Sequence, residues 1–178
     1  MRDGDGWVTC SAGHRHWGLF GAAGLLLAAV DPAGVVRVLL QHRAAWSHHG
    51  DTWGIPGGAR GSVESGEQAA LREAVEETGL DPLGVTLAAA SEEAHGGWSY
   101  TTVLATASGL LPVHAEDQES TAVAWVALAE VDGLPLHPGF AGAWPALQPW
   151  IASLAAGAPD PYAAAARPLP TVVAPKIG

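Results

Sequence analysis

The sequence is poor in cysteine and in basic residues. Cys10 is the only cysteine in 178 residues, which excludes an intramolecular disulfide framework and a thiolate zinc cluster and is typical of a reducing cytoplasm. Lysine and arginine together number 8 against 18 aspartates and glutamates, so the formal net charge is −10. Proteins that hold extended nucleic acid or anionic membranes need a basic surface, so neither partner is expected.

Long apolar runs are also missing. The longest stretch, Leu19–Val30, contains glycines and ends at Asp31-Pro32, whereas about 18 apolar residues are needed to cross a bilayer. The opening residues lack the basic region of an export signal, so we expect a cytoplasmic protein. The hydrophobic fraction of 48% can supply one core. We therefore expect a lead-in over residues 1–18, a domain over 19–156 and an Ala/Pro-rich tail over 157–178.

The hydrophobic pattern predicts a mixed sheet with helices on its faces rather than a doubly wound parallel fold. Strands are expected at 20–30, 35–41, 85–91, 99–107 and 122–128, a long loop at 44–61, and helices at 65–78 and 147–156. The first two strands flank a turn at 31–34 and predict a hairpin. Ser65 and Gln68 form a capping box for the first helix, and Gly79 is suited to end it.

The first predicted helix gathers three carboxylates on one face. At 100° per residue, Glu73, Glu76 and Glu77 fall within an arc of about 100°, and small or apolar residues fill the opposite face. Like charges at these spacings repel each other by a few tenths of a kcal/mol per pair, and a bound cation would reverse that sign. A solvated acidic helix face is the alternative for such a pattern taken alone.

The sequence around this helix resembles the Nudix box, G-x5-E-x7-R-E-U-x-E-E-x-G-U, where U is apolar. The matching residues are Gly58, Glu64, Arg72, Glu73, Ala74, Glu76, Glu77, Gly79 and Leu80. Trp53–Gly58 and Val123–Val126 resemble the segment before the box and a late strand of the same superfamily, so the resemblance covers about residues 20–150. It implies an α/β (α+β) Nudix fold, an α/β/α sandwich with a mixed β-sheet. It also implies hydrolysis of a diphosphate linked to another group.

The resemblance assigns roles to the residues of the box. Mg²⁺ or Mn²⁺ is expected on Glu73, Glu76 and Glu77, with the carbonyl of Gly57 as a further ligand. The residues expected to support the box are Gly58, Glu64, Arg72 and Gly79, with an ion pair between Glu64 and Arg72. Glu73 is one candidate for the general base. Glu119 is another and is also a candidate metal ligand, with Glu116 and Asp117 as rivals for that late acidic position.

Other residues are candidates for substrate contacts. Arg43 and Arg60 could each bind a phosphate through a bidentate fork, and His48, which precedes His49, could touch substrate. Trp46, Trp98 and Trp144 could stack on a base or belong to the core, whereas Trp53 and Trp125 are expected to pack. The sequence has no H-E-x-x-H motif and Cys10 has no cysteine partner, so no zinc site is expected.

The most favoured function is a metal-dependent pyrophosphohydrolase that acts on a small nucleotide-like diphosphate. A nucleoside triphosphate, ADP-ribose, a nucleotide sugar or a dinucleoside polyphosphate remains open as the substrate, because the box fixes only the reaction. A non-catalytic nucleotide sensor on the same fold is the alternative. A prenyl diphosphate isomerase is disfavoured because it needs a cysteine in the core, and Cys10 lies in the lead-in. A homodimer is possible.

Overall fold

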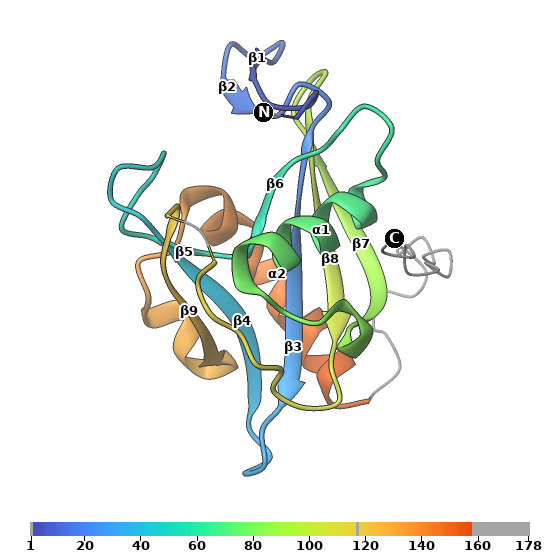
Figure 1. Cartoon of the computed structure of the whole chain (residues 1–178), viewed down its shortest axis with the longest axis vertical. Helices are drawn as coiled ribbons and strands as arrows, with labels where there is room; N and C mark the ends of the chain where they lie inside the picture. Colours follow the sequence, from blue (N-terminus) through green and yellow to red (C-terminus); the bar gives the residue numbers. More distant parts are fainter. Residues whose placement is uncertain (1, 117, 158–178) are drawn as a thin grey trace.

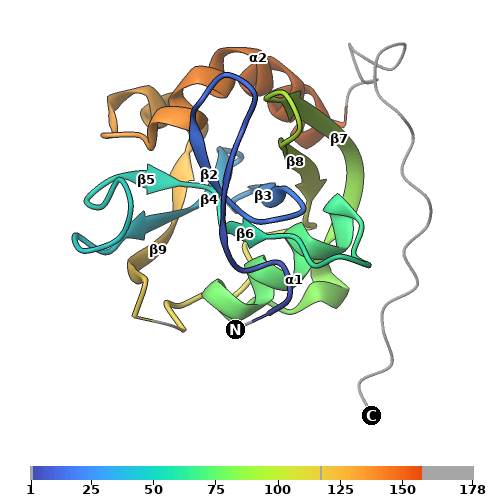
Figure 2. The same cartoon turned by 90° about the horizontal axis from the view of Figure 1, so that it is seen from above.

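The computed structural model describes residues 2–116 and 118–157, and it places a seven-stranded mixed sheet between two helices (Figures 1 and 2). The sheet strands are β3 Ala22–Val30, β4 Val36–Arg43, β5 Trp53–Gly54, β6 Gly57–Ala59, β7 Thr86–Ala94, β8 Ser99–Thr106 and β9 Ser120–Ala127. The helices are α1 Gly66–Thr78 and α2 Pro138–Ala155, with 3₁₀ turns η1 Pro82–Gly84 and η2 Leu128–Gly133. A separate two-stranded ribbon consists of β1 Trp7–Thr9 and β2 Arg15–Trp17. The predicted α/β/α arrangement is confirmed.

The two central strands of the sheet diverge, and this divergence creates the site. β3 and β4 pair only over Ala28–Val30 and Val36–Val38, next to their hairpin turn. Further along, β4 pairs with β5, while β3 pairs with β6. The short segment 53–59 therefore runs between the separated strands. On its other edge β3 pairs in parallel with β8, which makes the sheet mixed.

The alternation of side chains along β3 divides the core into two layers. Leu25 and Leu27 face α1, whereas Leu26 and Ala28 face α2. The layer under α1 uses small helix residues, which are Ala69, Ala70 and Ala74. The layer under α2 is built from large side chains, which are Phe140, Trp144, Leu147, Trp150 and Ile151. The sheet is thus buried on both faces, as the nearly continuous apolar sequence of β3 indicates.

Local sequence sets both ends of α1. The Ser65 side chain accepts a hydrogen bond from the Gln68 amide, and the Gln68 side chain accepts one from the Ser65 amide. Gly79 ends the helix in the left-handed conformation, with φ of 62°, and its amide donates to the Val75 carbonyl. The predicted capping box and helix end are both confirmed.

The prediction for α2 was wrong at its beginning, because the helix starts at Pro138 rather than near residue 147. Its interior contains Pro145 and Pro149, which cannot donate backbone hydrogen bonds. The carbonyls four residues before the two prolines, those of Ala141 and Pro145, therefore lack a donor within the helix. Ala141, Pro145 and Pro149 are all exposed, so water can donate to these carbonyls instead. Burial of the opposite aromatic face outweighs the loss of these bonds.

Two other predictions need correction. The lead-in 1–18 contains the β1–β2 ribbon, although its polar and glycine-rich sequence gave no sign of strands. The expected loop 44–61 contains β5 and β6, which are too short to show an alternating pattern. The predicted tail lies outside the described residues beyond residue 157.

Candidate active site

A cavity of about 940 Å³ opens where β3 and β4 diverge. Its walls come from α1, from the β5–β6 segment, from β8, from the loop between β4 and β5, from the start of α2 and from the β1–β2 ribbon. The carboxylates of Glu73, Glu76 and Glu77 line one part of it, with the backbone of Gly57 and Gly58. The structure therefore places these acidic residues in a hollow large enough for a nucleotide.

Glu77 is the most firmly held of the three helix carboxylates. It is only 6% exposed, and its Oε2 atom accepts a hydrogen bond of 2.8 Å from the Gly57 amide. This bond ties α1 to the segment between β5 and β6. Glu73 is half-buried beside it, and Glu76 is exposed on the next turn toward the solvent.

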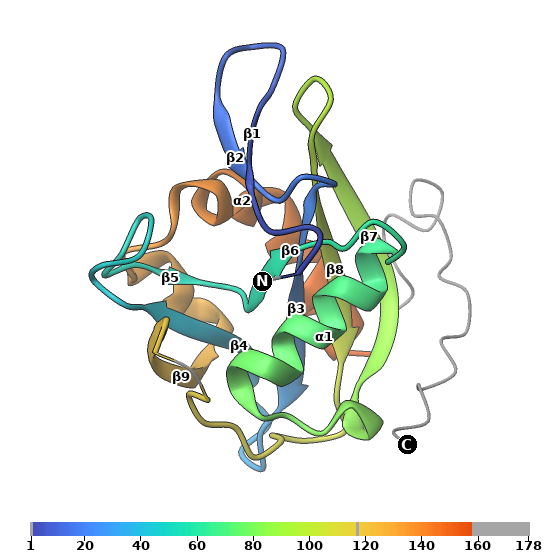
Figure 3. The same cartoon turned by 45° about the horizontal axis from the view of Figure 1, so that its top comes forward.

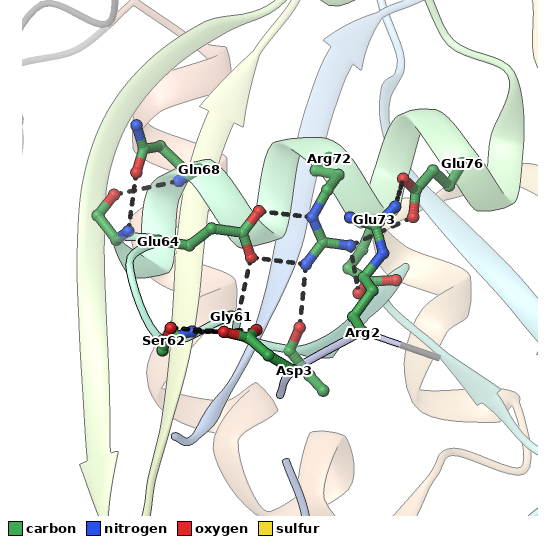
Figure 4. A network of polar contacts seen from close by, with 11 residues as sticks. Arg2, Asp3, Gly61, Ser62, Glu64, Gln68, Arg72, Glu73 and Glu76 are labelled. Carbon is green, nitrogen blue, oxygen red and sulfur yellow. Dashed lines mark hydrogen bonds and ion pairs between the residues drawn. The ribbon is translucent and has the colours of Figure 1, made fainter. Parts of the chain in front are cut away.

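Arg72 links the box into a single network (Figure 4). Its Nε and Nη2 atoms donate to the two carboxylate oxygens of Glu64, at 2.7 and 2.8 Å, and Nη2 also donates to the Ala59 carbonyl at 3.0 Å. Its Nη1 atom donates to Glu73 at 2.6 Å and to Glu76 at 3.2 Å. The Arg72 guanidinium holds the pKa of Glu64 below its usual range. The structure thus has Glu64 and Arg72 as the ion pair that the resemblance implies.

The carboxylate cluster has the chemistry of a site for a hard divalent cation. Burial raises the pKa of Glu73 despite its contact with Arg72, and the negative charge of Glu76 acts in the same direction. Glu76 also forms an ion pair with Arg2, so a residue from the N-terminal segment partly neutralises the cluster. Oxygen ligands crowded on one helix face suit Mg²⁺ or Mn²⁺, whose charge would relieve their mutual repulsion. The residues present therefore fit the metal that the Nudix box implies.

The absence of side chains at the glycines lets the backbone approach this cluster. A Cβ atom on Gly58 would lie 2.7 Å from the Glu73 carboxylate carbon, and one on Gly57 would lie 2.5 Å from the Ala23 carbonyl oxygen. At Gly24 a Cβ atom would lie 2.2 Å from the hydroxyl of Tyr100. Gly57 requires glycine because backbone atoms occupy the space of a side chain, whereas a side chain at Gly58 would displace the Glu73 carboxylate and one at Gly24 would displace the Tyr100 hydroxyl.

The late acidic residues occupy different places. Glu119 lines the cavity just before β9, and its backbone carbonyl accepts a hydrogen bond from the Ala44 amide. Glu116 instead contacts His114, at 2.6 Å, and lies outside the set of described residues that line the cavity. Asp117, the other rival, lies outside the described residues.

The candidate substrate contacts divide in the same way. Arg43 and His48 both line the cavity, and the Arg43 Nε atom donates to the His48 carbonyl at 3.2 Å. Burial and the neighbouring His49 and Arg43 lower the pKa of His48, which favours a neutral ring. Arg60 borders a separate shallow hollow beside Leu19 and Phe20 and is absent from the described lining of the main cavity.

The tryptophan candidates also separate. Trp46 is 69% exposed and lines the cavity, as does Trp98, whereas Trp144 is 2% exposed and belongs to the core. Trp53 packs against the layer under α2, and Trp125 packs against the layer under α1, in agreement with their expected roles.

Sequence reasoning missed the N-terminal ribbon as part of the site (Figure 3). Trp7, Arg15 and Trp17 all line the cavity, and the two indoles contact each other edge to face at 5.5 Å. The signal available was a pair of tryptophans in a segment with little other apolar material. Two further wall residues, Tyr100 and His137, were missed because strand pairing and a helix start bring them to the cavity.

Comparison with known proteins identifies the family. The NUDIX domain model matches residues 21–148. The chain belongs to the Nudix family. A protein of Mycobacterium tuberculosis named as a candidate 8-oxo-dGTP diphosphatase 3 is 52% identical over 152 residues, which cover 82% of this chain and 70% of that protein. A Nudix hydrolase fusion protein of Bifidobacterium longum is 44% identical over 80% of this chain and 30% of its own length.

Solved Nudix structures have the same fold. RenU, a Nudix hydrolase from M. smegmatis, superposes with a TM-score of 0.78 at 47% identity, covering 85% of this chain and 97% of that one. The NUDIX domain of Shewanella oneidensis NrtR, crystallised with ADP ribose, gives a TM-score of 0.56 at 25% identity, covering 73% and 85% of the two chains. The protein is therefore a Nudix hydrolase, and Nudix hydrolases generally use divalent metals. In the part of the chain that the structure describes, no helix has the length and apolar character to span a membrane.

Proposed function

We propose that this Nudix hydrolase is a Mg²⁺- or Mn²⁺-dependent pyrophosphohydrolase of nucleoside triphosphates. The observation that carries the proposal is the composition of the cavity described above. Carboxylates and glycine backbone gather in one part of it, and the rest of its lining includes histidines and the exposed tryptophans Trp7, Trp17 and Trp46, which form its rim. A triphosphate with its metal ion needs carboxylates and close backbone, and a nucleobase needs aromatic rings and hydrogen-bonding groups.

Glu73, Glu76 and Glu77 would hold the metal, with the Gly57 carbonyl as a further ligand. A bound divalent cation would supply positive charge against the diphosphate oxygens. The chain itself contributes rigidity, because the Gly57 amide fixes Glu77 and Arg72 fixes Glu64 and Glu73. Gly58 and Gly79 support the box by allowing the close approach to Glu73 and the sharp end of α1.

Glu119 is the residue that we assign to accept the proton of the attacking water. It reaches the cavity from the segment before β9, whereas Glu73 already shares the Arg72 guanidinium. A carboxylate that holds the metal is not available to accept this proton, so we assign that step to the acidic residue of the other element. Arg43 lines the same cavity, which supports its assignment to a phosphate group of the substrate.

The rim provides the contacts for the base. Trp7 and Trp17 are 42% and 43% exposed, so their rings are accessible for stacking. Burial lowers the pKa of His137 to about 4, so this ring is a neutral hydrogen-bonding group at physiological pH. The name of the M. tuberculosis relative points to an oxidised guanine nucleotide among the triphosphates.

The other hypotheses have less support. The carboxylates that a non-catalytic sensor could lose are all present at the cavity. Cys10 is absent from the described lining of the cavity, so an isomerase that needs a cysteine there is disfavoured.

A substrate and metal panel tests the proposal. The full chain is assayed with 8-oxo-dGTP, dGTP, ADP-ribose and a dinucleoside tetraphosphate, each with Mg²⁺, with Mn²⁺ and with a chelator. We expect nucleoside monophosphate and pyrophosphate from the triphosphates, with the highest kcat/KM for 8-oxo-dGTP. Glu77→Gln should lower kcat by about 100-fold or more, because it removes a group required for metal binding.

Glu116→Gln is the matched control, since this carboxylate lies just outside the cavity and should leave kcat within about threefold of wild type. Full activity in the presence of chelator, or in Glu77→Gln, contradicts the proposal. Preference for ADP-ribose or the dinucleoside tetraphosphate would keep the reaction but replace the substrate class.

A further inference from the structure

The pairing of the N-terminal ribbon places Cys10, His14 and His16 on the same face. Val8 pairs with His16 and Thr9 pairs with Arg15, and the hairpin continues through a hydrogen bond from the Cys10 amide to the His14 carbonyl. Residues directly opposite each other share a face of a ribbon, and successive residues alternate between faces. Trp7, Arg15 and Trp17 consequently occupy the other face.

The three side chains lie close enough together to bind one metal ion. One ligand atom from each of Cys10, His14 and His16 lies within 4.8 Å of the other two. Tetrahedral ligands bonded at roughly 2.0–2.3 Å lie about 3.3–3.8 Å apart, so small side-chain rotations would complete the site. Cys10 is 5% exposed, which leaves its sulfur directed inward rather than toward bulk water.

His16 supplies an independent indication of a ligand. Its Nε2 atom is buried and has no hydrogen-bond partner among the described residues. A buried polar atom of this kind destabilises the fold unless an ion or a water satisfies it. The ring is held in place by stacking on Trp98 at 4.2 Å and 13°, and the His95 ring lies 5.0 Å away.

We infer that Cys10, His14 and His16 bind one zinc-class transition metal, with water or His95 in the fourth position. A thiolate with two imidazoles selects such a metal over Mg²⁺, which prefers oxygen ligands. His16 also lines the large cavity, but the site uses none of the carboxylates there, and the inference goes beyond the proposed function. It departs from the expectation from sequence, which considered only cysteine partners for Cys10 and not the neighbouring histidines.

The position of the site gives the metal a structural role. β1 and β2 have three residues each, and isolated ribbons of this size are marginally stable in water. The turn between them contacts the β7–β8 turn through a hydrogen bond from the Ser11 amide to the Gly96 carbonyl, and the two turns lie side by side in Figures 1 and 3. A metal on this face would fix the opposite face, which carries Trp7 and Trp17, at the mouth of the cavity.

A second histidine group is less suited to a metal. His48, His49 and His137 also have ligand atoms within 4.8 Å of one another. However, the His137 Nδ1 atom accepts the Gly139 amide at the start of α2, which places the proton of the neutral ring on Nε2. A metal bound at Nε2 would displace that proton, and a metal bound at Nδ1 would remove the acceptor of the Gly139 amide that caps α2.

Cobalt titration of the full chain, purified without a histidine tag and stripped of metal, tests the proposal. We expect about one equivalent of Co²⁺ to give the thiolate-to-metal charge-transfer absorption of a tetrahedral site, and Zn²⁺ to displace it. Cys10→Ser should abolish this absorption, and His14→Gln or His16→Gln should weaken binding at least about tenfold. Wild-type Cys10 should also become protected from thiol reagents when Zn²⁺ is added.

Two control variants separate this site from other metal binding. His114→Gln removes a histidine outside the group and should leave the absorption unchanged. Glu77→Gln should impair Mg²⁺-dependent hydrolysis but retain the cobalt spectrum, so failure of one proposal does not imply failure of the other. Absence of the thiolate absorption at saturating Co²⁺, or its persistence in the double variant H14Q/H16Q, overturns the inference.

Discussion

The two faces of the sheet are packed in opposite ways. Under α1 the helix contributes Ala69, Ala70 and Ala74, all fully buried. Under α2 the helix contributes three large aromatic residues, Phe140, Trp144 and Trp150. One face therefore buries little volume per residue, and the other buries a great deal.

This difference in packing means that α1 positions the proposed catalytic carboxylates, while the residues under α2 contribute most of the buried volume. Small side chains allow α1 to lie close to the sheet, and Glu77 on this helix accepts a hydrogen bond from the Gly57 amide. Burial of large aromatic groups under α2 stabilises the fold without restricting the position of the catalytic helix. Substitutions on the two faces should consequently have different effects on stability and on kcat.

Trp144→Ala should produce the largest loss of stability. Trp144 is 2% exposed, and its Nε1 atom donates to the Asp132 carboxylate at 2.9 Å. Its removal leaves a cavity and an unpaired acceptor, which should cost about 3–5 kcal/mol in urea unfolding. If this variant does not fold, Trp144→Phe should cost less. The kcat of the folded fraction should remain within about threefold of wild type, and a much greater decrease would contradict the separation of the two faces.

Ala74→Leu tests the α1 face. The extra carbons have no space at a fully buried position and should destabilise the protein by about 1–3 kcal/mol. Because α1 must move outward, kcat should also fall by about tenfold or more. Ala146→Leu, on the exposed face of α2, is the matched control and should change stability by less than about 0.5 kcal/mol. Unchanged kcat in a destabilised Ala74→Leu protein would show that the close approach of α1 is unnecessary.

Glu64→Gln tests the ion pair that locks the loop onto α1. The variant should lose about 1–2 kcal/mol at pH 7, less than a fully buried pair because water reaches this carboxylate. Since Arg72 lowers the pKa of Glu64 in the folded state, its contribution is present above the ordinary value of 4.5 and disappears as pH falls through the folded-state pKa. Denaturant unfolding from pH 7 to pH 3 should therefore show the two proteins converging in acid. A constant difference at all pH values would exclude the ion pair as its cause.

His137→Asn should have the smallest effect, and only below neutral pH. The ordinary pKa of this histidine is 6.5 and the folded-state value is about 4, so the unfolded chain binds the additional proton between these values. Wild-type stability should then decrease as pH falls from 7.5 to 5, by about 1 kcal/mol through this group after allowance for its partial exposure. Asparagine keeps an acceptor for the Gly139 amide and does not titrate. Equal pH dependence in both proteins would assign the effect to other groups.

Sequence predicted best where local interactions determine the structure. The capping box at Ser65 and the end of α1 at Gly79 depend on neighbouring residues and were confirmed. The box likewise brought Glu73, Glu76 and Glu77 together because one helix carries all three. The roles of these residues, and those of Glu119 and Arg43, remain predictions.

Structure determined by distant contacts was not accessible in the same way. The start of α2 was missed because its prolines argue against a helix, and only burial against the sheet offsets them. Arg60 is close to the box in sequence, but its position after β6 directs it to another hollow. The ribbon has strands too short for a recognisable period, so neither its aromatic face nor its Cys10–His16 face could be inferred.

The parallel pairing of β3 with β8 has a consequence for synthesis on the ribosome. Ala22 pairs with Tyr100, and the register continues to Ala28 and Thr106. A nascent chain therefore carries the apolar β3 without its longest pairing partner until the residues of β8, more than 70 positions later, have emerged. Contacts so distant in sequence form slowly, and we expect productive folding to begin only after β8 has left the exit tunnel.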